Sequence, residues 1–423
     1  MNFTLKRKAV TLRNQINYPL QFNPFVFSKL FFFWALIGIV GGVIASGYWI
    51  VLESMMHYLS QVQGLYVILL MGGAGFLAGL IIHFLGDPGE MDLIVNNIRF
   101  KGGRLEPRNN PSMILSSLLC ISSGGSAGPE APLVQVVGST GSWLAKKFKF
   151  KGEDVRSLSI AGMAAAFTAL FGAPLGGSLF ALEILHHKHV VEYYHALIPA
   201  FVASCSSFVV FILLTHIGIG PTWVFPVYST PELNDVFYAM LYALAGTAAG
   251  WLFIFTIRQC RAIFKSIKLP IYASMTLGGL IIGAIAYFVP LSRYFSHDEL
   301  SVLLEQEFTL QFLVVLMLAK ILAIAFTVTS GWRGGFIIPL FFVGATVGMI
   351  VNAAFPGQNV ALILVSCMAA INACVTRTPI STTILLATLT GFHHFVPIMF
   401  ASLTGFFLAP KTPLINAQLG VKE

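Results

Sequence analysis

Apolar residues fill most of the chain, in runs long enough to cross a lipid bilayer. A helix needs about 20 apolar residues to span the hydrocarbon core, and six runs come near that length. They cover residues 26–52, 64–85, 191–216, 236–256, 271–290 and 309–329. Polar loops are few, and the main ones are 98–111, 217–235 and 291–308. This pattern predicts an all-α polytopic membrane protein.

Shorter apolar segments lie between the long runs, and glycine or proline interrupts many of them. They cover residues 112–121, 133–145, 157–171, 175–185, 337–354, 359–373 and 379–391. Broken helices are tolerated at membrane depth only where the freed backbone groups are buried in protein or line an aqueous cavity. We therefore expect helices that stop partway through the membrane.

A stretch rich in glycine and proline occurs twice. Residues 123–133 and 330–340 share Ser, Gly, Gly, Pro and Leu without a gap, at an offset of 207. Residues 163–174 and 368–379 match at an offset of 205. Two matches in the same order predict two homologous halves. They are a first transmembrane repeat at 26–216 and a second at 236–409, with a connecting loop at 217–235 and a short C-terminal segment at 410–423. Interrupted helices at matching places in two halves indicate a binding site near the membrane midplane.

The composition excludes a set of soluble domains. Only 10% of the 423 residues are charged and 57% are hydrophobic, whereas soluble proteins are about a quarter charged. The net charge is +8, but the basic residues form no stripe, so we expect no nucleic-acid partner. Residues 1–25 include several basic residues and no acidic ones. This predicts that the N-terminal segment is cytoplasmic and that the protein lies in the plasma (inner) membrane. The five cysteines lack CxxC spacing, so we expect free thiols and no metal site.

The paired breaks suit the binding of an anion. Each break places free backbone N–H groups and the positive end of a helix dipole at the start of a new helix. Partial charges of this kind hold an anion and also release it. Gly128–Pro132 and Gly334–Pro339 are therefore candidate halves of one anion site. Glu130 lies inside the first break, and its carboxylate would compete with an anion for the same N–H groups, which makes it a candidate gate and proton carrier.

Four segments resemble motifs of the CLC family of chloride channels and proton-coupled anion exchangers. Residues 128–135, GPEAPLVQ, resemble the motif G-[RK]-E-G-P-x-V-Q, and residues 330–339, SGWRGGFIIP, are similar to S-G-x-x-G-G-x-F-x-P. Residues 173–183, APLGGSLFALE, look like A-P-L-x-G-x-x-F-x-x-E, and residues 377–380, RTPI, look like R-x-P-[LI]. The order and spacing fit from about residue 30 to residue 420.

This resemblance implies a CLC-like homodimer whose subunits each carry two inverted-topology repeats and one anion pathway. It implies that Glu130 is the gating glutamate and that no cofactor is needed beyond a bound anion, with chloride as the default ion. Backbone amides of Phe336 and Ile337 would face the central anion and that of Ala131 the outer position, and Gly128 is a further candidate anion-binding residue. The chain is then a transporter of anions and protons in the bilayer, and not an enzyme.

The sequence departs from the family at several places. Asp87 falls where the family has a serine that touches the central anion. Three possibilities remain open: the carboxyl is protonated, it caps a helix or is repositioned, or the site is built differently; we favour the second. Ile415 replaces an anion-touching tyrosine, which predicts a wider or more weakly binding inner mouth. Glu183 is followed by Ile184, where exchangers usually carry a second glutamate, so Glu183 itself is expected to be structural, making a helix-end bond.

Arg333 precedes the second motif, where it could add positive potential to the pathway or extend to the membrane interface. The missing second glutamate favours a channel-like conductor, whereas the retained Glu130 and the compact chain favour anion/proton exchange, with fluoride or another anion as an alternative. A different class, an intramembrane enzyme or cation transporter, would use Glu130, Asp87 and the cluster of His186, His187 and His189. Against the enzyme, we find no HExxH motif.

Overall fold

The computed structural model describes residues 29–185, 190–226 and 232–418. These residues form α-helices and short 3-10 turns, together with one isolated β-bridge. The helices of the first half are α2 (Lys29–Leu59), α3 (Tyr66–Leu85), α4 (Met91–Phe100), α5 (Asn110–Ser122), α6 (Glu130–Lys147), α7 (Glu153–Phe171), α8 (Pro174–Glu183) and α9 (Val190–Thr215). Those of the second half are α10 (Leu233–Ile267), α11 (Ile271–Phe288), α12 (Glu299–Glu305), α13 (Leu310–Thr329), α14 (Ile337–Ala354), α15 (Val360–Thr376), α16 (Pro379–Thr390) and α17 (Phe395–Phe407).

The predicted all-α membrane architecture is confirmed. Eight of the described helices are long and apolar enough to cross a membrane, and α15, α16 and α17 belong to a shorter apolar group. Three helices were not predicted. α4 and α12 lie within or beside the expected polar loops and are too short to span a bilayer. α17 contains Pro397 in its first turn, where proline is tolerated because that N–H would have no partner within the helix.

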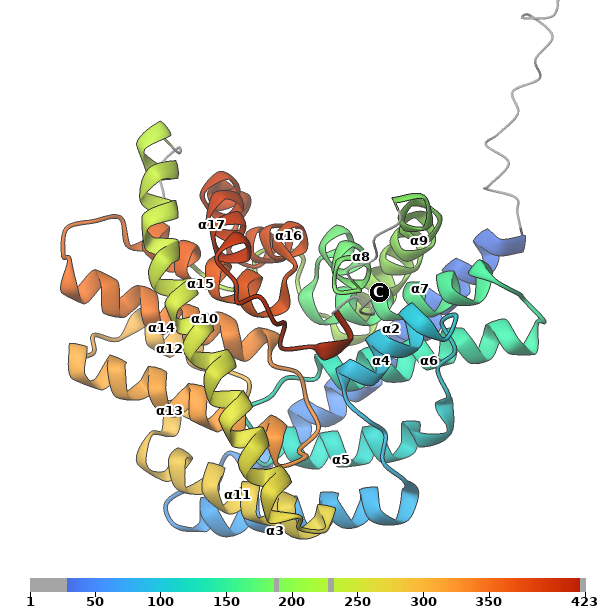
Figure 1. The fold of residues 1–423 in the computed structure, drawn as a ribbon, viewed down its shortest axis with the longest axis horizontal. Helices are drawn as coiled ribbons and strands as arrows, with labels where there is room; N and C mark the ends of the chain where they lie inside the picture. The colour runs from blue at the N-terminus through green and yellow to red at the C-terminus, as the bar shows by residue number, and fades with distance from the viewer. Residues whose placement is uncertain (1–28, 186–189, 227–231, 419–423) are drawn as a thin grey trace, which may run out of the picture.

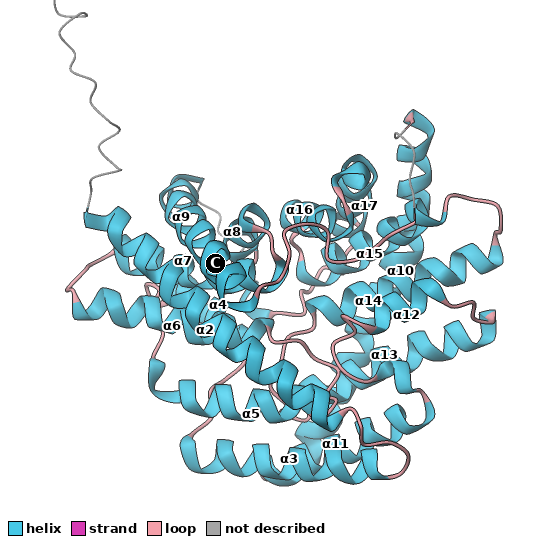
Figure 2. Cartoon of the chain, turned by 180° about the vertical axis from the view of Figure 1, so that it is seen from behind, coloured by secondary structure: helices cyan, strands magenta, loops and turns pink. Residues whose placement is uncertain are grey.

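The two halves repeat helix by helix. Each helix from α2 to α9 has a counterpart from α10 to α17, at an offset close to that of the glycine–proline stretches. The counterparts α3 and α11 pack against each other at one edge of the molecule (Figures 1 and 2). Gly75 of α3 contacts Met275, and Gly79 contacts the earlier residue Tyr272. The pair is therefore antiparallel, as expected for two repeats of inverted topology.

The central helices of the two halves are α7 and α15, because most of their residues are buried, on every side of the helix. A helix that is apolar on every side is typical of such a central position. α8, α9, α16 and α17 lie at the edge of the molecule opposite α3 and α11 (Figure 1). Helices α5, α6, α13 and α14 lie between these edges (Figure 1). The breaks between α5 and α6 and between α13 and α14 are therefore placed in the interior.

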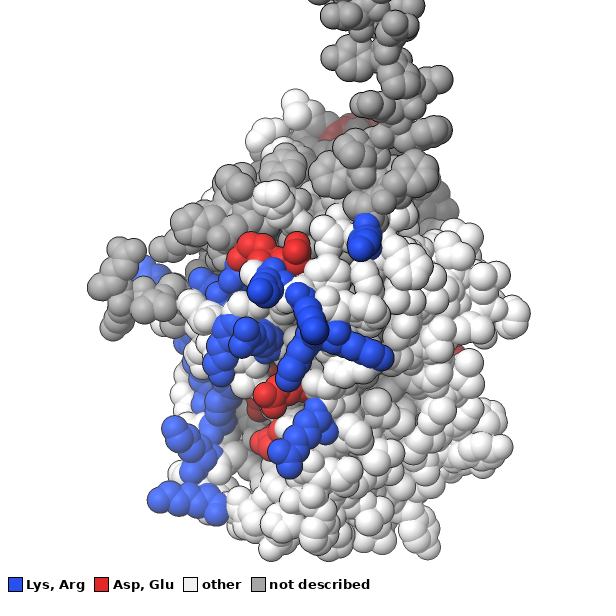
Figure 3. Space-filling model, turned by 90° about the vertical axis from the view of Figure 1, so that its right-hand side faces the viewer, with Lys and Arg blue, Asp and Glu red and all other residues white. Residues whose placement is uncertain are grey.

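One end of the first half is strongly basic. Lysine and arginine side chains gather on the face shown in Figure 3. The exposed basic residues in the segments 101–108 and 146–151 are Lys101, Arg104, Arg108, Lys146, Lys147, Lys149 and Lys151. Phe33, near the start of α2, packs against Phe148 and Phe150, which follow α6. The chain therefore enters the described structure on the basic side.

Candidate functional site

The two glycine–proline breaks meet in the interior through their backbones. The N–H of Gly128 donates to the carbonyl of Gly335 over 2.8 Å, and the N–H of Gly335 donates back over 2.6 Å. This antiparallel bridge joins residues that are 207 positions apart, which is the offset between the repeats. The bridge therefore lies where the pseudo-symmetric halves touch.

Two helices begin beside this bridge. α6 starts at Glu130 and α14 starts at Ile337, each two residues after its bridging glycine. Pro132 and Pro339 are the third residues of these helices, where a missing N–H costs no hydrogen bond. The first N–H groups of a helix have no partner within it and carry positive partial charge. The breaks thus bring two helix N-termini, with the partial positive charges of their free N–H groups, to one place.

The Glu130 side chain occupies this place. The residue is fully buried, and its Oε1 accepts a hydrogen bond from the backbone N–H of Ile338 over 2.8 Å. Its Oε2 is buried without a hydrogen-bond partner. A side chain added at Gly335 would come within about 2.5 Å of Oε2. The carboxyl group of one repeat is therefore bound to the helix N-terminus of the other.

A cavity, here called the site cavity, lies beside Glu130. Of the residues predicted from the sequence, it is lined by Glu130, Ala131, Ile184, Arg333, Phe336, Ile337 and Ile415. Its other charged lining residues are Glu90, Asp92 and Arg261. Three predicted residues, Asp87, Gly128 and Glu183, are not among its lining residues. The C-terminal segment thus reaches the cavity through Ile415, which brings no hydroxyl group.

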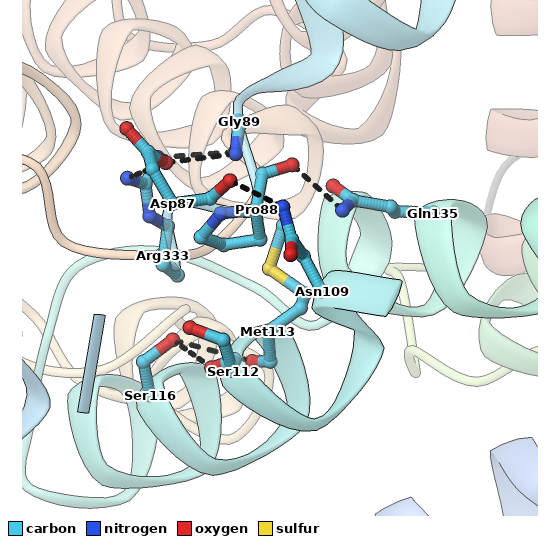
Figure 4. A network of polar contacts seen from close by, with 9 residues as sticks. All are labelled: Asp87, Pro88, Gly89, Asn109, Ser112, Met113, Ser116, Gln135 and Arg333. Atoms are coloured by element: carbon cyan, nitrogen blue, oxygen red, sulfur yellow. Dashed lines mark hydrogen bonds and ion pairs between the residues drawn. The ribbon is translucent and has the colours of Figure 1, made fainter. Parts of the chain in front are cut away.

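Asp87 is paired with Arg333 (Figure 4). Its Oδ1 lies 2.7 Å from an Nη of Arg333 and also accepts the N–H of Gly89 over 2.8 Å. The second Nη of Arg333 donates to the carbonyl of Gly89 over 3.0 Å. Only 5% of the Arg333 side chain is exposed, against 66% for Asp87. The alternative that Arg333 extends to the membrane interface is therefore wrong, since the side chain is buried and paired.

Two amide side chains hold the turn that carries Asp87. Asn109 donates to the carbonyl of Asp87, and Gln135 of α6 donates to the carbonyl of Pro88 over 2.7 Å (Figure 4). The Asp87 carboxylate closes a short turn by accepting the N–H of Gly89. It does not cap α4, which begins at Met91, after Glu90. The turn is thereby tied to α6 and, through Arg333, to the second break.

Glu183 binds a helix end. Its two carboxylate oxygens accept the backbone N–H groups of Ile380 and Ser381, over 3.0 and 2.7 Å, and the hydroxyl group of Ser381. These N–H groups belong to the first turn of α16, which begins at Pro379. The carboxylate thus joins the C-terminal end of α8 to the N-terminus of its counterpart. The next residue, Ile184, lines the site cavity with an apolar side chain.

A buried lysine near the first break was missed. Lys320 lies in the middle of α13, is fully buried, and donates from Nζ to the carbonyls of Ser292, Arg293 and Tyr294. The N–H of Tyr294 in turn donates to the carbonyl of Gly124. A lone lysine within the apolar run 309–329 is itself a signal, because an intramembrane charge is costly and needs partners. Ile338 was also missed, since only its backbone takes part.

Of the residues that the alternative of an intramembrane enzyme or cation transporter would use, Glu130 lines the site cavity and Asp87 does not. His186, His187 and His189 lie outside the described residues. Within the described ranges there is no group of three or more histidine, cysteine, aspartate or glutamate side chains that could hold a metal ion. Asp87 is bound to Arg333 and does not line the cavity beside Glu130.

Comparisons with known proteins agree with this architecture. The family model described as voltage gated chloride channel matches residues 74–410. The chloride/fluoride channel protein of Pseudomonas syringae pv. tomato is 27% identical over 367 residues, which are 84% of this chain and 78% of that protein.

Two solved structures share the fold. A CLC-type fluoride/proton antiporter superposes with a TM-score of 0.83 at 20% identity, covering 94% of this chain and 99% of that one. A slow cyanobacterial Cl⁻/H⁺ antiporter superposes with a TM-score of 0.80 at 19% identity, covering 92% of this chain and 96% of that one. The arrangement of broken helices is therefore one that known antiporters also have.

Proposed function

Because the chain belongs to the voltage-gated chloride channel family, we propose that it carries anions through the membrane and that Glu130 is the gate. The observation that carries this proposal is the hydrogen bond from the Ile338 N–H to Glu130 Oε1. The carboxylate occupies the N–H group and the dipole end that an anion would need. This hydrogen bond supports a closed state in which the carboxylate blocks the position of the anion.

Protonation of Glu130 opens the pathway. A neutral carboxylic acid is a weaker hydrogen-bond acceptor than a carboxylate, so it leaves the N-terminus of α14 more readily. An anion then replaces the carboxylate at the N–H of Ile338, with the dipoles of α6 and α14 both directed at it. Release of the proton returns Glu130 to the site and displaces the anion. Anion and proton are thereby exchanged through one position.

The transport mode is anion/proton exchange, with chloride as the first ion and fluoride as the second to test. The hydrogen bond from the Ile338 N–H to Glu130 supports exchange, because an exchanger must block its pathway between the anion step and the proton step. Ile184 provides no inner proton acceptor, but Glu90 and Asp92 line the same cavity. Protons therefore reach Glu130 through the site cavity, by way of these two carboxylates. A channel-like conductor is the competing mode.

The cytoplasmic side of the protein is the basic one. The exposed lysines and arginines beside α6 and α7 support this orientation, because cytoplasmic loops carry an excess of positive charge. The N-terminus then lies in the cytoplasm and the protein in the plasma (inner) membrane.

The protein functions as a homodimer through α8 and α16. Leu175 and Ile380, near the beginnings of these neighbouring helices, are about half exposed, and in the proposed dimer they would pack against the partner.

Flux measurements with purified protein in liposomes test the proposal. A chloride gradient should drive chloride efflux together with uphill proton movement, and the reversal potential should follow the anion gradient. Chloride flux without proton movement would replace exchange by channel conduction. A reversal potential that follows the potassium gradient would overturn anion transport in favour of cation transport.

A further inference from the structure

The site cavity has an unfavourable balance of charge for an anion. Its acidic lining residues are Glu90, Asp92 and Glu130, whereas its basic lining residues are Arg261 and Arg333. Arg261 is 43% exposed and lies 3.6 Å from Glu90, so water and this carboxylate both weaken its attraction for an anion. Arg333 is therefore the one buried base that lines the cavity among the residues that the structure describes.

The guanidinium group of Arg333 is only partly satisfied. One Nη is bound to Asp87 and the other to the carbonyl of Gly89. Of its other N–H groups, the one at Nε is buried without a hydrogen-bond partner, in a residue that is itself about 95% buried. A buried donor without a partner costs free energy until something accepts its hydrogen bond. An anion in the adjoining cavity is an acceptor of the right charge.

On this basis, and resting on the proposed function, we propose that Arg333 binds the transported anion in the site cavity before it reaches Glu130. Arg333 lies two residues before Gly335, the bridging glycine next to the gate, so the anion moves only a short way between the two positions. Asp87 controls the strength of this binding, because its carboxylate offsets part of the positive charge. A full unpaired guanidinium would hold the anion too tightly for rapid release.

Chloride binding to the purified full-length protein, measured by titration calorimetry, tests this role. Arg333→Gln should raise the Kd for chloride at least tenfold, which corresponds to about 1.4 kcal/mol. Arg261→Gln is the matched control, since it removes the other arginine of the same cavity. Because Arg261 is exposed and screened by water, the Kd of the Arg261→Gln protein for chloride should differ less than threefold from that of the unmodified protein. Equal effects of the two substitutions would overturn the proposal.

Asp87→Asn keeps the proposal testable if Arg333→Gln fails to fold. Asparagine retains an oxygen for the N–H of Gly89 but removes the negative charge. Chloride should then bind at least threefold more tightly, with slower turnover in liposomes. Weaker binding in Asp87→Asn would contradict the role given to Arg333. Failure of the unmodified protein to bind or transport chloride or fluoride would overturn the proposed function, whereas normal transport with an unaffected Arg333→Gln variant would overturn only this inference.

Discussion

Removing the Glu130 carboxyl group should leave the pathway open. On the proposed function, the closed state is held by one hydrogen bond, 2.8 Å long, from the Ile338 N–H to Oε1. A hydrogen bond to a charged group contributes about 1.5–3 kcal/mol. Because Oε2 is buried without a partner, part of that gain is lost to desolvation, and the lower value of about 1.5 kcal/mol applies. Since each 1.4 kcal/mol is a factor of ten, Glu130→Ala should raise the open population about tenfold.

The assay is chloride efflux from liposomes, recorded with a chloride electrode and a pH electrode at the same time. Glu130→Ala should conduct chloride faster than the unmodified protein, without proton movement and without dependence on pH. Glu153→Ala is a suitable control, because this exposed carboxylate pairs with Arg156 on the surface of α7. Its flux should be unchanged. If Glu130→Ala kept both the original flux and its coupling to protons, Glu130 would not be the gate.

Three further substitutions test other parts of the account. Gly335→Ala should displace the Glu130 carboxyl group, because the added carbon would lie about 2.5 Å from Oε2. The chloride flux of this variant should lose its dependence on pH. Retained pH dependence would contradict the placement of Glu130 against Gly335. Glu183→Ala should lower the free energy of unfolding by about 3 kcal/mol, since a half-buried charged acceptor with several donors at the start of α16 is lost, and an unchanged thermal melting temperature would contradict this. Lys320→Met should destabilise the protein by about 2–4 kcal/mol, because it leaves buried carbonyls without donors; thermal melting measures it, and an unaltered melting temperature would show that these bonds are dispensable.

Most of the fold was predictable because apolar length and the internal repeat constrain it strongly. A membrane-spanning helix must be long and apolar, and the runs at 64–85 and 309–329 correspond closely to α3 and α13. The constant offset of the repeated stretches anticipated the pairing of Gly128 with Gly335. α4 and α12 could not be predicted in this way, since short helices in polar loops owe their structure to tertiary packing.

The candidate site was predictable in its position and less so in its contacts. Glu130 was identified because a carboxylate at membrane depth is unusual. Ile338 could not be identified from side-chain chemistry, because only its backbone N–H takes part. The pair of Asp87 and Arg333 joins residues 246 positions apart, so it depends on how the two halves are placed. Among the possibilities for Asp87, the geometry favours a repositioned carboxylate bound by a neighbouring arginine.

The central claim is that an anion and the Glu130 carboxyl group compete for the same position between the two broken helices. A crystal structure of the Glu130→Gln protein soaked in bromide tests it most directly, because bromide is located by its anomalous scattering. We expect a bromide peak within hydrogen-bonding distance of the Ile338 N–H, where Oε1 lies in the described structure. Bromide that binds elsewhere in the protein while this position stays empty would contradict the claim.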